Sequence, residues 1–73
     1  MPTSAELGVK LQDERTAYAT WLKSHTTDAG YDLTGEQVGE FNTRNETLAK
    51  MQGEYELALK IDASAAENQA KLG

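Results

Sequence analysis

The sequence lacks the residues that most often stabilise or activate a small protein. Its 73 residues include no cysteine and a single histidine, His25, so a disulfide framework is excluded and a zinc site is disfavoured. The absence of cysteine is consistent with a reducing compartment. Nowhere do 18 or more apolar residues follow one another, and Met1 to Lys10 does not have the basic start and apolar run of a secretory signal. We therefore expect no membrane partner.

A chain this short forms at most one domain, and it buries too small a fraction of its surface for a large core. Small domains usually compensate with disulfides, metals or oligomerisation. Because the first two are disfavoured here, association with other copies or attachment to a larger body is expected.

The charge is distributed unevenly. Residues 1–27 contain three acidic and three basic side chains, so residues 28–73 carry the whole formal charge of -5. The basic residues are dispersed, and an acidic surface repels phosphate groups. We therefore expect neither nucleic acid nor anionic lipid as a partner.

A first helix is predicted near the N-terminus. Thr3 and Glu6 have the spacing of a capping box, which places the helix start near Ser4. The poor helix formers around Asp28 and the following Gly30 predict helix over about 4–28 and a turn over about 29–34. Glu14 interrupts the apolar face of this helix, which otherwise consists of Leu7, Leu11, Tyr18, Trp21 and Leu22.

A second, longer helix is predicted over about 35–68, with fraying beyond Ile61. Thr34 and Gln37 form another capping box, and Leu33 and Val38 occupy the positions of a hydrophobic staple. Several Glu–Lys or Glu–Arg pairs at i, i+4 support helix along the whole segment. One predicted seam follows alternating steps of three and four residues: Val38, Phe41, Asn45, Leu48, Gln52, Tyr55 and Leu59.

A short turn between two amphipathic helices makes them antiparallel neighbours. The predicted fold is therefore all-α, a single coiled-coil-like antiparallel two-helix hairpin over 1–73 whose second helix is the longer. We expect the apolar residues named for both helices to mediate hairpin packing or self-association. Asn45 and Gln52 in the seam either fix register and oligomeric state or mark a partly hydrated stretch.

No catalytic, cofactor-binding or metal-binding residue is assigned. His25 has no separable nucleophile and orienting group around it, and its position near a helix end favours a structural role. Asp28, Asp32, Glu36 and Glu40 gather around the turn but do not match an EF-hand loop. We therefore expect no enzyme activity.

The segment 32–42 (DLTGEQVGEFN), followed by the stripe Leu48, Met51 and Tyr55, resembles the N-terminal scaffolding (delta) domain of tailed-phage major capsid proteins of the Hong Kong phage fold. The resemblance implies a segment inside the immature capsid, in the host cytoplasm, that guides the association of capsid subunits and is then removed by proteolysis. Its partners would be copies of itself, neighbouring capsid subunits and the maturation protease. The shell-forming domain of that family is absent from the 73 residues, and no cleavage bond is assigned.

Three functions follow from the sequence, in order of preference. The first is the non-enzymatic scaffolding domain. The second is a stand-alone adaptor whose acidic hairpin binds a basic protein, with little self-association. The third is a small enzyme or metal protein that organises His25 or the carboxylates of the turn.

Overall fold

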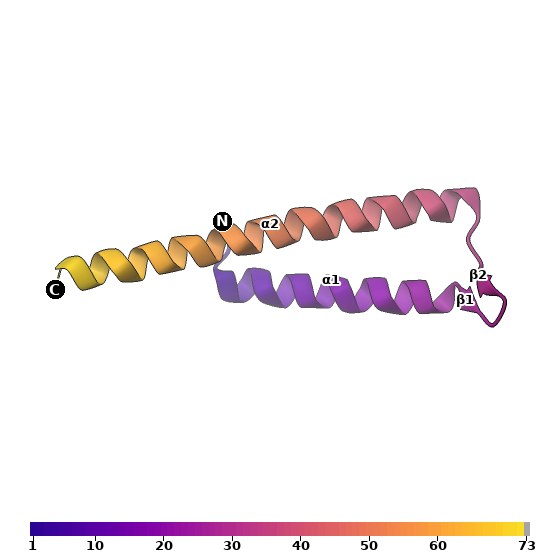
Figure 1. Cartoon of the computed structure of the whole chain (residues 1–73), viewed down its shortest axis with the longest axis horizontal. Coiled ribbons are helices and arrows are strands. Elements are labelled where there is room, and N and C mark those ends of the chain that lie inside the picture. The colour runs from indigo at the N-terminus through magenta and orange to yellow at the C-terminus, as the bar shows by residue number, and fades with distance from the viewer. Residues whose placement is uncertain (73) are drawn as a thin grey trace.

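A computed structural model, which describes residues 1–72, shows two long helices side by side (Figure 1). Helix α1 spans Ser4–Ser24 and helix α2 spans Gly35–Leu72. Between them, strands β1 (Thr26–Thr27) and β2 (Gly30–Tyr31) form a small antiparallel pair. The prediction of a helical hairpin with a longer second helix is confirmed.

Both predicted helix starts are capped. At α2, the backbone N–H of Thr34 donates to Gln37 Oε1 (2.8 Å) and the backbone N–H of Gln37 donates to Thr34 Oγ1 (3.3 Å), so the capping box is complete. At α1, Thr3 Oγ1 accepts from the backbone N–H of Glu6 (3.3 Å), but the Glu6 carboxylate accepts from the Thr3 hydroxyl. Local side chains therefore determine where each helix begins.

The connection differs from the predicted turn, because α1 ends at Ser24 and not near Asp28. The hydroxyls of Ser24 and Thr26 donate to the last carbonyls of α1, on Trp21 (2.6 Å) and Leu22 (2.8 Å). Gly30 has a φ of +125°, as a glycine at a tight reversal can, but it belongs to β2 and does not end α1. These hydroxyl bonds satisfy the helix end and allow Thr26–Thr27 to pair with Gly30–Tyr31.

Helix α2 is longer than predicted and extends past α1. The Ser4 hydroxyl donates to the Asp62 carboxylate, so the start of α1 lies level with Asp62, and residues 63–72 project beyond it (Figure 1). We call residues 63–72 the overhang. The molecule measures 61 × 18 × 16 Å, and its radius of gyration of 17.6 Å exceeds the roughly 11 Å expected for a compact domain of this length.

The two helices bury very little between them. Within residues 1–72 the buried side chains are Leu7, Leu11 and Ala58. Around them lies a row of α2 residues at alternating steps of four and three, all buried or half-buried: Gln37, Phe41, Arg44, Leu48, Met51, Tyr55 and Ala58. The interhelical row thus shares Phe41, Leu48 and Tyr55 with the predicted seam. At each of its other positions, the row uses the residue that directly precedes the seam residue in the chain.

Two glycines of the helices differ in what surrounds them. A Cβ added at Gly53 meets nothing within 4 Å, whereas one added at Gly8 lies 3.1 Å from Tyr55 Cε1. We expect Gly53→Ala to raise the free energy of unfolding by about 1 kcal/mol, because alanine restricts the unfolded chain and favours helix. Thermal unfolding followed by circular dichroism measures it. Gly8→Ala is the matched control and should gain clearly less; an equal gain would contradict the close approach of the helices at Tyr55.

Candidate interaction surface

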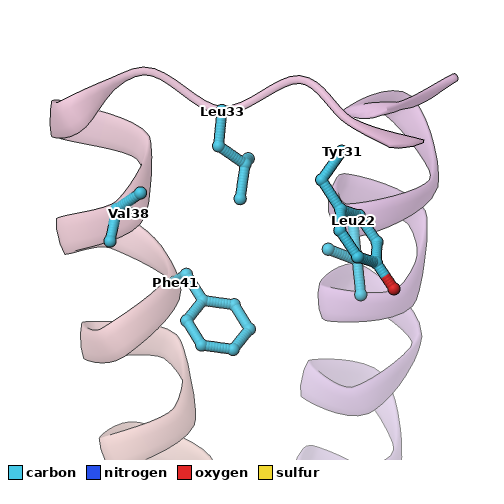
Figure 2. Close-up of a pocket in the computed structure, with 5 residues that line it drawn as sticks. All are labelled: Leu22, Tyr31, Leu33, Val38 and Phe41. Carbon is cyan, nitrogen blue, oxygen red and sulfur yellow. The ribbon is translucent and has the colours of Figure 1, made fainter. Parts of the chain in front are cut away.

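An apolar groove opens at the turn end of the hairpin. It has a volume of about 350 Å³, and its lining residues are Leu22, Tyr31, Leu33, Val38 and Phe41. Figure 2 shows Leu33 reaching down from the connecting segment into the gap between the helices, with Phe41 pointing toward it from α2. Tyr31 and Val38 are 74% and 47% exposed, so the groove is open to solvent. We call it the tip groove.

The groove results from the local structure described above. The β1–β2 pair directs Tyr31 back toward Leu22, and the complete capping box fixes the entry of the chain into α2, so that Leu33 and Val38 both line the groove. The staple pair predicted from the sequence therefore lies at a surface opening and not in a closed core.

Next to the groove, aromatic side chains fill the space between the helices. The ring of Tyr18 lies 6.4 Å from that of Trp21 and 6.2 Å from that of Phe41. The imidazole of His25 lies 5.1 Å from the Trp21 ring, and its backbone N–H donates to Leu22 O (3.1 Å) at the end of α1. The predicted structural role of His25 therefore has a geometric basis in ring contact and helix capping.

A charged cluster occupies the interhelical row at mid-length. Arg44 lies 3.8 Å from Glu14 across the helices and 3.9 Å from Glu40 on its own helix, and its guanidinium carbon is 5.2 Å from the centre of the Trp21 ring. Its Nε is buried and has no hydrogen-bond partner within residues 1–72. Glu14, which interrupts the apolar face of α1, therefore faces a cation. Arg44 is not part of the seam predicted above, although it lies seven residues from both Gln37 and Met51 on the interhelical row.

The polar residues of the predicted seam bridge one edge of the helix pair. Asn45 Nδ2 donates to Phe41 O (2.8 Å) and to Tyr18 Oη (3.4 Å), and Gln52 Oε1 accepts from the Arg15 guanidinium. Gln52 also donates to the Glu56 carboxylate (3.0 Å). Asn45 is exposed, so these bonds lie at a partly hydrated edge where they link α1 to α2 in one register.

The structure places the predicted packing residues in three groups. Leu7 and Leu11 are buried, and Val38, Asn45 and Leu59 are exposed. The others are half-buried between the helices or at their edge: Tyr18, Trp21, Leu22, Phe41, Leu48, Gln52 and Tyr55. Of the exposed members, Asn45 links the helices through its hydrogen bond to Tyr18, whereas Val38 and Leu59 are accessible to another molecule.

Further apolar side chains are exposed along the second half of α2. Leu57, Leu59 and Ile61 are 51%, 44% and 49% exposed, and Leu72 at the end of the overhang is 83% exposed. The overhang also begins with four consecutive small residues that leave its backbone accessible to a neighbouring helix: Ala63, Ser64, Ala65 and Ala66. Along the overhang no residue of α1 faces α2.

Among residues 1–72, no three His, Asp or Glu side chains come together in a geometry that could hold a metal ion. No helix in this part of the chain has the length and apolar character needed to cross a bilayer. No protein-family model, curated protein or solved structure matches this chain.

Proposed function

We propose that this hairpin is a non-enzymatic assembly module that associates with copies of itself, and that its particular role is that of a scaffolding segment of a tailed-phage major capsid protein. The observation that carries the proposal is the thin interhelical core, with Leu7, Leu11 and Ala58 as the buried side chains of residues 1–72. Two helices form one layer, and a stable domain usually packs a second layer against the first. A second copy can supply that layer.

The exposed area supports this argument. The chain exposes 5506 Å², whereas a folded monomer of 8.0 kDa typically exposes about 4,450 Å². The excess of roughly 1,000 Å² is comparable to the roughly 800 Å² that each partner contributes to a standard interface. In a pair, each chain would therefore expose about as much surface as a folded monomer of its mass.

The apolar side chains that association would cover are on α2. Leu57, Leu59 and Ile61 lie close to the point on α2 beyond which α1 no longer packs against it. From there the overhang continues α2 with no α1 residue beside it. In the overhang, Glu67 and Lys71 pair with each other (3.1 Å), so the overhang has no net charge and presents no electrostatic barrier to a second overhang. Antiparallel pairing of two copies along this part of α2 is the expected contact.

The capsid assignment rests on the resemblance of residues 32–42 and of the following stripe to scaffolding domains. The two helices, the capped start of α2 and the acidic second half suit a segment that guides assembly inside a container later filled with DNA, since acidic residues do not compete for phosphate. In this role the partners are neighbouring capsid subunits, and a maturation protease removes the segment from the immature capsid in the host cytoplasm.

Sedimentation velocity over a wide concentration range tests the association. We expect the sedimentation coefficient to rise with concentration, and the helical signal in circular dichroism to become more resistant to heat at high concentration, because oligomers are stabilised by mass action. Ile61→Asp should weaken association by about tenfold or more, since a charge is placed in an apolar contact. Val9→Asp, on the exposed face of α1, is the control. A monomer over the whole range would refute the proposal.

The coding sequence that follows codon 73 tests the capsid role separately. We expect the same reading frame to continue for a few hundred codons that encode a shell-forming domain. A single domain typically has roughly 100–200 residues, so a shorter continuation would not suffice. An immediate stop codon would refute the capsid assignment and leave the association of the hairpin unaffected.

A further inference from the structure

The tip groove combines an apolar lining with strong exposure. Its five lining side chains carry one polar atom that can donate a hydrogen bond, the hydroxyl of Tyr31, and Tyr31 itself is 74% exposed. A volume of about 350 Å³ accommodates one large aliphatic or aromatic side chain and its neighbours. Filling the groove would remove water from Val38 and Tyr31, which are 47% and 74% exposed.

The surroundings of the groove are acidic. Between Lys23 and Arg44 the chain has no lysine or arginine, and it has four exposed acidic residues: Asp28, Asp32, Glu36 and Glu40. Asp32 stands between Tyr31 and Leu33 in the chain, and Glu36 lies one position from the capping residue Gln37. Arg44 lies 3.8 Å from Glu14 and 3.9 Å from Glu40, so it offsets one of these four carboxylates, and Asp28, Asp32 and Glu36 have no ion pair within residues 1–72.

One basic residue lies near the groove. Lys23 lines a shallower depression beside it, together with Leu22 and Tyr31. With Lys23 and Arg44 counted against the four carboxylates, the turn end still has a formal charge of -2. Exposed charges act over about 10 Å at 0.1 M salt, so Asp32, which is adjacent in the chain to Tyr31 and Leu33, can act on a segment bound in the groove.

This charge decides between occupants. The turn end of a second copy has the same four carboxylates, so an isologous contact through two tip grooves would bring like charges together, which is unfavourable. A segment rich in lysine and arginine is attracted to the same surface, and its apolar side chains fit the lining.

We propose that the tip groove binds a basic amphipathic segment of another protein, which places an aliphatic or aromatic side chain between Leu22, Leu33 and Phe41 and its lysine or arginine side chains beside Asp32 and Glu36. This site is separate from the association surface on the second half of α2 and does not depend on self-association. The hairpin thus has two functional ends, one for copies of itself and one for a basic partner.

The test is a titration of the full chain, labelled with ¹⁵N, with a synthetic twelve-residue peptide of alternating leucine and lysine pairs. We expect the amide resonances of Leu22, Tyr31, Leu33 and Val38 to shift, and the affinity to fall as salt rises. The same peptide with glutamate in place of lysine should not bind. Shifts confined to the overhang, or equal binding of the glutamate peptide, would overturn the proposal.

Matched variants locate the charge effect. Asp32→Asn with Glu36→Gln should weaken binding by about fivefold to tenfold, because two exposed ion pairs are lost. Asp13→Asn with Glu46→Gln removes the same charge from exposed sites away from the groove and should leave the affinity within about twofold. Equal losses in both double variants would show non-specific attraction and overturn the proposal.

Two further measurements separate this site from self-association. Tyr31→Ala should reduce peptide binding and leave the sedimentation behaviour of the chain unchanged, since Tyr31 lies at the opposite end from the overhang (Figure 1). If the groove resonances shift on concentrating the chain without peptide, a second copy occupies the groove and the proposal is wrong. The salt dependence of the native chain provides a readout that needs no variant.

Discussion

Leu11→Ala should lower the free energy of unfolding by about 2–5 kcal/mol, the range measured when a buried leucine is truncated to alanine. Leu11 is 5% exposed and is one of three buried side chains within residues 1–72. The other two are too few to compensate for the loss of its packing contacts. A domain of 73 residues typically has a total stability of about 4–11 kcal/mol, so the loss is a large share of it. We expect a midpoint of thermal unfolding, measured by circular dichroism, that falls by ten degrees or more, at roughly 4–8 °C per kcal/mol.

Val9→Ala is the matched control for Leu11→Ala. Val9 belongs to the same helix but is 62% exposed, so truncation removes little buried area and should change the free energy of unfolding by less than about 0.5 kcal/mol. Equal effects of the two substitutions would mean that Leu11 is not part of a packed interhelical core.

Replacing the central charged pair by apolar residues, as Glu14→Leu with Arg44→Met, should stabilise the hairpin by about 1–2 kcal/mol. Partly buried ion pairs lose hydration that their attraction does not fully restore, and apolar replacements of similar volume often gain 1–4 kcal/mol. The gain is reduced because the contact of Arg44 with the Trp21 ring, worth about 0.5–1 kcal/mol at an exposed site, is lost. The side chains of Arg44 and Glu14 are 26% and 34% exposed, which also limits the gain. Chemical denaturation measures it.

The single variants complete a double-mutant cycle. Arg44→Met alone leaves the Glu14 carboxylate facing an apolar row and should be the less stable of the two singles. Glu14→Leu alone leaves Arg44 beside Glu40 (3.9 Å) and should be nearly neutral. A double variant that is less stable than the native chain would show that the pair contributes net stability, against this account.

The sequence predicted the helix starts because their determinants are local. Thr34 and Gln37 satisfy each other's backbone groups within one turn, so four residues are enough to specify the start of α2. The end of α1 could not be predicted in the same way. It depends on hydroxyls of Ser24 and Thr26 that bond backward and on a two-residue strand pair that forms once Gly30 reverses the chain.

The choice of interhelical row was also beyond the sequence. Hydropathy favours the row through Val38 and Leu59, whereas the structure uses the adjacent row through Arg44 and Ala58. Both rows include Phe41 and repeat every seven residues, so periodicity alone does not separate them. The difference arises from packing: Ala58 is small where the start of α1 approaches α2, and the Arg44 guanidinium has both Trp21 and Glu14 opposite it.

The unequal lengths of the helices have a mechanical consequence. Both chain termini lie away from the β1–β2 turn, and α2 carries the C-terminal one past the start of α1 (Figure 1). A body joined to Leu72 would hold the hairpin at one end. The β1–β2 turn would then lie at the opposite end of a molecule 61 Å long. A small bend in the overhang would move the β1–β2 turn over a long distance. A tethered hairpin could therefore reach targets throughout the space around its point of attachment.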